Sequence, residues 1–108
     1  MNKSTLREQN AAFLGTGGCS QVNSSLGFRP AFFDFATQTL YPSRFADGRP
    51  APFHLLEGLP DEVIADRAPS GRVTSTRPTL MSGFERNGYF YTRSAAARAV
   101  RDWVSLAA

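Results

Sequence analysis

The chain has 108 residues and a formal net charge of +3, and 42% of its residues are hydrophobic. This length and composition are typical of one globular domain and exclude a wholly disordered chain. The single cysteine excludes an internal disulfide and a cysteine-based metal site, which favours a reducing, cytoplasmic location. No apolar run is long enough for a signal peptide or a membrane span, so we expect a chain that starts at Met1 and has no membrane partner.

Charge is distributed unevenly along the chain. Residues 30–66 carry two Arg and six acidic residues, whereas residues 67–108 carry seven Arg and two acidic residues. Eleven of the twelve basic residues are Arg, whose planar guanidinium suits bidentate contacts with carboxylates and phosphates. A GC-rich genome explains the same preference, so the charge alone does not identify a partner.

The first 27 residues are expected to form an irregular, flexible region that precedes a single domain over residues 28–108. Residues 15–27 are rich in Gly, Ser and other small or polar residues that interrupt regular structure. The Gly15–Gly18 segment lacks the Gly-Lys-Ser/Thr ending and the βαβ context that a phosphate-binding loop needs. We therefore interpret it as a turn and assign it no role.

Two short aromatic segments come next and are predicted to form two strands of a meander. They cover residues 31–35 and 40–45, with the turn-forming Thr37-Gln38 between them. Pro42 lacks the N–H group that a central strand must donate, so the second strand belongs at a sheet edge. An exposed edge is able to pair with a second copy of the chain, which leaves both a monomer and a homodimer open.

The segment near residues 60–66 is predicted to form a short helix of about two turns. Pro60 suits a first helical position, and Asp61 and Glu62 suit the positive end of a helix dipole. Residues 72–77 then alternate weakly and include β-branched side chains, which indicates a further strand.

The clearest local signal is a hairpin followed by a helix. Asn87-Gly88 lies between aromatic, strand-prone flanks, and both residues tolerate the positive φ angles of a two-residue type I′ turn. Thr92 is predicted to cap the helix that follows. We therefore expect an α+β fold in which a small antiparallel sheet packs against a C-terminal amphipathic helix. The apolar face of this helix contains Ala96, Ala99, Val100, Trp103 and Ala107.

No catalytic, cofactor-binding or metal-binding set emerges from the sequence. Cys19, His54 and Asp34 could supply a nucleophile, a base and an orienting acid, but no nucleophile-elbow motif supports them. His54 is the only histidine and lies in an apolar segment, where a packed side chain is the simpler interpretation. We therefore expect a protein that is not an enzyme.

The hairpin offers the best candidate for a binding surface. Its register places Arg86, Tyr89 and Tyr91 on one face. If this face is exposed, it forms a stacking and charged platform for nucleic acid or an acidic protein. If it packs against the helix that carries Trp103, it belongs to the core. The candidate binding residues are Arg86, Tyr89, Tyr91, Arg93, Arg98 and Arg101.

Four segments resemble small uncharacterised proteins of proteobacterial phages and prophages. They are residues 27–34, 41–45, 47–52 and 83–93, and together with their surroundings they extend over much of the chain. Such phage-borne proteins include stoichiometric inhibitors of host defence, among them anti-CRISPR proteins. The resemblance implies an interaction protein that binds a protein or ribonucleoprotein partner in the host cytoplasm, and it assigns no site residue.

Two other interpretations stay open. The first is an arginine-rich protein that binds nucleic acid directly through residues 67–108, because its arginines would release counterions from phosphates. The second is a small enzyme that uses Cys19 and His54, which requires both side chains in one pocket.

Overall fold

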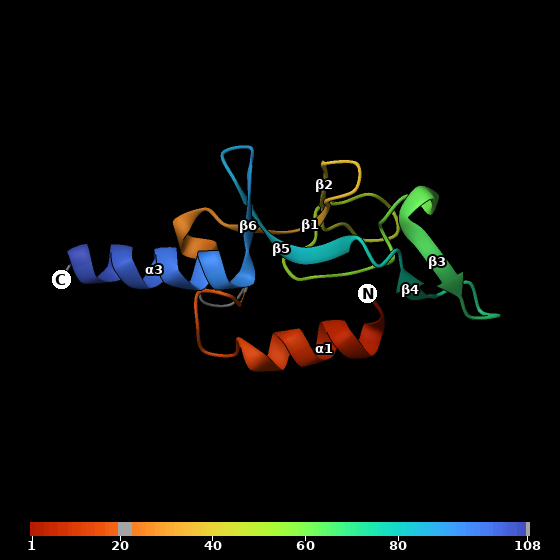
Figure 1. Ribbon diagram of the computed structural model, residues 1–108, viewed down its shortest axis with the longest axis horizontal. Helices are drawn as coiled ribbons and strands as arrows, with labels where there is room; N and C mark the ends of the chain where they lie inside the picture. Colours follow the sequence, from red (N-terminus) through yellow and green to blue (C-terminus); the bar gives the residue numbers. More distant parts are fainter. Residues whose placement is uncertain (20–22, 108) are drawn as a thin grey trace.

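The computed structural model describes residues 1–19 and 23–107 and shows an α+β fold (Figure 1). Its helices and strands are α1 (Lys3–Ala12), β1 (Arg29–Asp34), β2 (Thr39–Pro42), β3 (Ile64–Arg67), β4 (Val73–Thr76), β5 (Leu80–Arg86), β6 (Tyr89–Thr92) and α3 (Arg93–Ala107). Single 3₁₀ turns cover Ser24–Leu26 and Asp61–Val63. One antiparallel sheet has the strand order β2-β1-β5-β6, and β3 and β4 form a second. The molecule is elongated, and α3 extends from one end.

The hairpin between β5 and β6 forms as predicted. Asn87 and Gly88 have φ angles of 54° and 85°, which fit a type I′ turn. Arg86 pairs with Tyr89 across the turn. The Thr92 hydroxyl accepts a hydrogen bond from the Ala95 amide at 3.1 Å, so the predicted helix cap is also confirmed.

The meander of β1 and β2 is confirmed too. Residues 31–34 pair with residues 39–42 in an antiparallel register. Gln38 adopts a positive φ of 54° in the turn between them. As Pro42 predicts, β2 lies at an edge of the four-stranded sheet.

The prediction of an irregular region over residues 1–27 is wrong for its first part, where α1 forms. The Asn2 side chain caps this helix by accepting from the Thr5 amide at 2.7 Å. Leu6 of α1 is buried in the core, so this helix belongs to the same domain as the sheets. Burial of one apolar side chain and a polar cap outweigh the weak helical pattern. Residues 20–22 of the same region lie outside the described residues.

The short helix predicted near residues 60–66 is largely a strand. A single 3₁₀ turn covers Asp61–Val63, and the chain continues directly into β3. Val63 is buried in the core, and Ile64 pairs with Thr76 of β4. Two consecutive β-branched residues therefore favour sheet pairing over helix extension.

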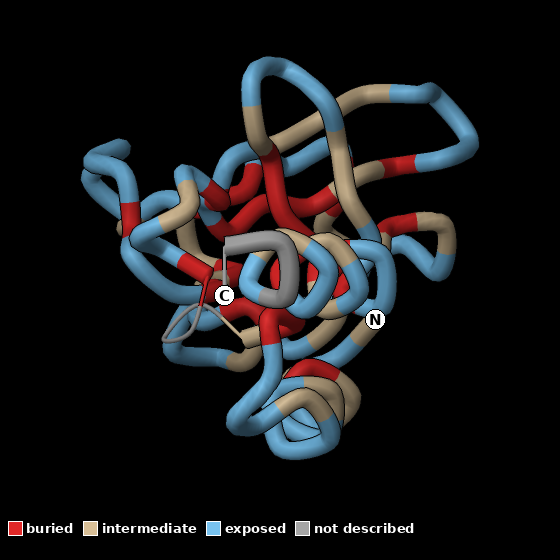
Figure 2. Tube along the Cα trace, turned by 90° about the vertical axis from the view of Figure 1, so that its left-hand side faces the viewer, coloured by how far each residue is buried: buried red, intermediate tan, exposed pale blue. Residues whose placement is uncertain are grey.

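Both hydrophobic cores lie on one side of the four-stranded sheet. Phe32, Leu80 and Phe84 point to this side by strand alternation and register, and all three are buried. Figure 2 looks along the molecule from its α3 end and shows the buried segments gathered in the middle. The larger core contains Leu6, Phe32, Leu56, Leu59, Val63, Val73 and Leu80. The core beneath α3 contains Phe28, Phe84, Ala96 and Val100, with Ala99 and Trp103 packed against it.

The apolar face predicted for α3 is therefore the face that meets the sheet. Ala96 and Val100 are buried, and Trp103 is half-buried, with its ring stacked on Phe28 at a centroid distance of 5.6 Å. The side chain of Ala107 lies outside the described part of the chain. Trp103 thus packs against the core, as expected, rather than serving as an exposed binding residue.

Replacement of Thr92 by Ala tests the helix cap. Thr92 is exposed, so the substitution removes one hydrogen bond without opening a cavity. We expect Thr92→Ala to lower the free energy of unfolding by about 1 kcal/mol. Thr92→Ser keeps the capping oxygen and is expected to stay near wild type. Urea unfolding followed by circular dichroism measures both, and equal stabilities for the two variants would contradict the cap.

Candidate functional site

The hairpin face that carries Arg86, Tyr89 and Tyr91 turns toward α3. The Tyr91 ring packs edge-on against Phe28 at a centroid distance of 5.0 Å. The Arg86 guanidinium lies 4.7 Å from the centroid of the Trp103 ring, a cation–π contact. Tyr89, next to the turn, is the exposed member, at 71%. Two of the three side chains are therefore committed to the core beneath α3.

The other predicted binding residues do not join this group. Arg98 and Arg101 are exposed on α3. Arg93 begins the same helix but is buried, with 4% of its surface exposed. The structure therefore does not gather the six predicted residues on one surface.

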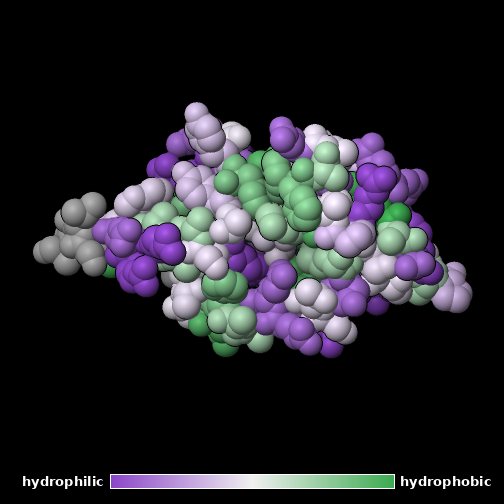
Figure 3. Space-filling model, in the orientation of Figure 1, coloured by the Kyte–Doolittle hydropathy of each residue, from purple (hydrophilic) through white to green (hydrophobic). Residues whose placement is uncertain are grey.

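The opposite face of the four-stranded sheet is apolar and partly exposed. Strand alternation and register place Phe33, Leu40, Met81 and Phe90 on it, and all four side chains are half-buried. Phe35 directly follows β1 and is 54% exposed. We call these five residues the apolar sheet face. Figure 3 shows an apolar patch over this part of the sheet, in the middle of the visible surface.

Gly83, at the centre of the sheet, allows the central aromatic contact of this face. The rings of Phe33 and Phe90 stack at a centroid distance of 5.1 Å although β5 runs between their strands. Gly83 of β5 lies beneath the Phe90 ring, and a Cβ atom at this position would collide with that ring. The absence of a side chain at Gly83 thus allows the aromatic contact across the strand.

A pocket of about 230 Å³ lies at the ends of β1 and β2 beside this face. Register places Arg29 and Pro42, two of its lining residues, on the same side of the sheet as the apolar sheet face. Arg29 pairs with Glu85 at 2.8 Å. Arg44 also lines the pocket, and its guanidinium donates only to a backbone carbonyl within the described chain. The pocket therefore combines proline walls with a basic rim.

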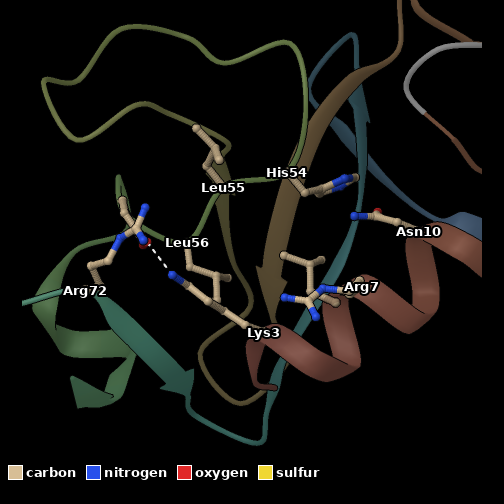
Figure 4. Close-up of a pocket in the computed structure, with 9 residues that line it drawn as sticks. Lys3, Arg7, Asn10, His54, Leu55, Leu56 and Arg72 are labelled. Atoms are coloured by element: carbon tan, nitrogen blue, oxygen red, sulfur yellow. Dashed lines mark hydrogen bonds and ion pairs between the residues drawn. The ribbon is translucent and has the colours of Figure 1, made fainter. Parts of the chain in front are cut away.

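A second pocket lies on the other side of the sheet, between α1 and the loop of residues 54–57 (Figure 4). Its volume is about 270 Å³, and the cations Lys3, Arg7 and Arg72 line it. Glu57 is its acidic residue and accepts from the Lys3 ammonium at 2.8 Å. Within the described chain, the guanidinium groups of Arg7 and Arg72 form no hydrogen bond or ion pair. We call this cavity the basic pocket.

Arg93 lies behind the basic pocket and binds only uncharged groups. Burial lowers the pKa of its guanidinium, and no carboxylate of the described residues pairs with it. Two of its acceptors, from Asn10 and His54, belong to residues that line the pocket. The guanidinium donates to the Ser82 hydroxyl at 2.9 Å, the Gly18 carbonyl at 3.1 Å, the Asn10 side-chain carbonyl and His54 Nδ1 at 3.1 Å.

Both ring nitrogens of His54 are occupied. Nε2 donates to the Gly83 carbonyl at 2.7 Å, and Nδ1 accepts from Arg93, so the neutral ring carries its proton on Nε2. Burial, together with the charge of Arg93, lowers the pKa of His54 to about 4. Cys19 and Asp34 make no hydrogen bond to the ring. The nucleophile, base and acid considered from the sequence therefore do not assemble, and His54 is the packed histidine that was expected.

The basic pocket could not be anticipated from an irregular N-terminal region. Lys3 and Arg7 are four residues apart and share one face only if the segment is helical. Arg72 joins them from the turn between β3 and β4, about seventy residues away in sequence. The Asn2 cap, three residues before Thr5, was the local signal for this helix.

Comparison of the chain with known protein families, with characterised proteins and with solved structures found no match. Among the described residues, no helix has the length and apolar character needed to cross a membrane. In the same part of the chain, no three side chains of His, Cys, Asp or Glu converge as a metal site would require. The proposed function therefore rests on the geometry of the molecule.

The depressed pKa of His54 predicts a specific acid sensitivity. In the unfolded chain the ring binds a proton below about pH 6.5, whereas the folded protein resists protonation down to about pH 4. The wild-type protein should therefore lose about 3 kcal/mol of stability from this residue as the pH falls through that window. His54→Gln removes the titration and should show a smaller loss over the same window.

Urea unfolding at a series of pH values measures this effect. The comparison of slopes, rather than of absolute stabilities, isolates His54 because the variant is expected to be less stable at neutral pH through lost packing. Parallel pH profiles for the two proteins would contradict the assignment of a neutral, buried imidazole.

Proposed function

We propose that this chain is a non-catalytic interaction protein that binds a protein partner through the apolar sheet face. The observation that supports the proposal is a partly exposed, aromatic sheet face whose reverse side already holds both hydrophobic cores. Hydrated apolar surface is unfavourable, and a contiguous patch of it marks an interaction site in many proteins. Phe33 and Phe90 are already ordered by mutual stacking, so little side-chain entropy is lost on binding.

The surroundings of this face define the chemistry of the partner. Arg44 forms no ion pair within the described chain, and Arg29 keeps 74% of its side chain exposed while it pairs with Glu85. Positive charge at the rim favours a partner that presents acidic side chains around an apolar centre. The pocket of about 230 Å³ beside the face is of a size to take one anchoring side chain.

The narrower form of the proposal is an inhibitor of a host defence complex that acts in the host cytoplasm. It rests on the resemblance of residues 27–34 and 83–93 to small phage-borne proteins. These two segments include Phe33 and Phe90, which stack at the centre of the apolar sheet face. Under this proposal the partner is a protein subunit of the defence complex, with its acidic and apolar surface in contact with the sheet.

Direct binding of nucleic acid is the alternative proposal. It would use a different surface from the apolar sheet face. Arg98 and Arg101 are the predicted arginines that stay exposed, and both lie on α3. Arg86 lies against Trp103, and Arg93 is buried. The two proposals therefore place the contact on different elements, which allows one set of variants to distinguish them.

Site-specific photo-crosslinking tests the apolar sheet face. We expect p-benzoylphenylalanine at position 35 to give a discrete adduct with a second protein in the native host cell. The same probe at position 53 is the matched control, because Phe53 is 49% exposed and lies in the loop after β2. An adduct with the mass of two copies of the chain would show that this face forms a homodimer and would overturn the proposal of a different protein partner. Equal labelling from both positions would also overturn the proposal.

Charge reversal tests the basic rim. We expect Arg44→Glu to reduce the adduct from position 35 by about fivefold or more, because like charges would face each other across the contact. Arg98→Glu makes the same change of charge on α3 and should leave the adduct unchanged. The reverse outcome, together with a salt-dependent gel shift that Arg98→Glu abolishes, would favour the nucleic-acid alternative.

A further inference from the structure

We propose that the basic pocket binds the phosphate group of a small phosphate monoester. This site is separate from the apolar sheet face, because it lies on the opposite side of the sheet between α1 and residues 54–57. Three cationic side chains and a single carboxylate line it. Lys3 is already paired with Glu57 at 2.8 Å, whereas Arg7 and Arg72 have no partner among the described residues. Two guanidinium groups are therefore available at the mouth for bidentate contacts with phosphate oxygens.

The buried wall of the pocket adds to its positive potential. Arg93 carries its charge behind Asn10 and His54, and its acceptors in the described part of the chain are all neutral. A charge in such a poorly solvated position acts over a longer range than an exposed one. His54 is held neutral, with its proton directed at the Gly83 carbonyl, and so does not change the charge of the wall.

One neutral donor completes the site. The side-chain carbonyl of Asn10 accepts from Arg93, which turns the amide nitrogen of the same side chain toward the pocket. Figure 4 shows this nitrogen on the pocket side of the residue, with Arg7 below it on the same helix. A ligand oxygen near α1 therefore meets a guanidinium and an amide donor on adjacent turns.

Size and polarity define the class of ligand. A volume of about 270 Å³ lies just below the usual range of small-molecule pockets, which favours a small molecule. Leu6, Leu55 and Leu56 also line the pocket and provide an apolar surface for the organic part of the ligand. The excess of cations over the one carboxylate suits a group of charge near −2, such as a phosphate monoester above its second pKa of about 6. A carboxylate, with a single charge, would leave part of the positive charge of the pocket uncompensated.

Titration with phenyl phosphate, followed by two-dimensional ¹H–¹⁵N NMR at constant ionic strength and near-neutral pH, tests the proposal. We expect saturable shifts for the amides of α1 and of residues 54–57. Arg7→Gln and Arg72→Gln should each weaken binding about tenfold, which corresponds to the loss of one charged contact. Arg98→Gln is the matched control, because it removes an exposed guanidinium from α3 and should leave the affinity unchanged.

A variant that is expected to bind more tightly distinguishes a loss of binding from a loss of folding, because a misfolded protein would not gain affinity. Glu57→Gln removes the carboxylate of the pocket and releases Lys3, so we expect it to bind phenyl phosphate several-fold more tightly. Benzoate offers the same ring with a single charge and should bind at least about tenfold more weakly. Absence of saturable shifts, an equal affinity for benzoate, or a similar loss in Arg98→Gln would overturn the proposal. The apolar sheet face is untouched by these variants, so failure here leaves the proposed protein interaction standing.

Discussion

The packing of this molecule depends on one buried guanidinium, that of Arg93, which has no carboxylate partner among the described residues. Arg93 is the first residue of α3, where the unpaired amides of a helix already carry partial positive charge. Removal of a cation from water costs several kcal/mol unless its donors are satisfied. Here the acceptors come from α1, from the glycine-rich turn after it, from β5 and from the loop that carries His54. Segments that are distant in sequence are thus held together because each supplies a hydrogen-bond acceptor to the same buried charge.

Gly83 connects this network to the apolar sheet face. Its carbonyl accepts from His54, which in turn accepts from Arg93, on the side of the sheet that faces the cores. Its missing side chain leaves space on the other side for the Phe90 ring to reach Phe33. A larger residue would displace the Phe90 ring and the backbone of β6, because both lie within contact distance of the added atom.

The parts of the fold that the sequence predicts are those encoded by neighbouring residues. The turn at Asn87-Gly88 and the cap at Thr92 require only local backbone preferences, and both form where expected. The contacts of Arg93 join residues up to 83 positions apart, and no local pattern specifies them. The same holds for Arg72, which the turn between β3 and β4 places at the pocket beside α1. The uneven distribution of charge along the chain therefore says little about where charge lies in the folded molecule.

The two candidate surfaces lie on opposite sides of β6 and the start of α3. Phe90 of β6 projects into the apolar sheet face, and Arg93 follows three residues later with its side chain in the buried network. Alternation along a strand requires this separation, because neighbouring side chains point to opposite faces. The Thr92 cap lies between them and fixes where the strand ends and α3 begins. The backbone from β6 to Arg93, together with the hydrogen bonds of Arg93 to Asn10 and His54, therefore connects the apolar sheet face to side chains that line the basic pocket.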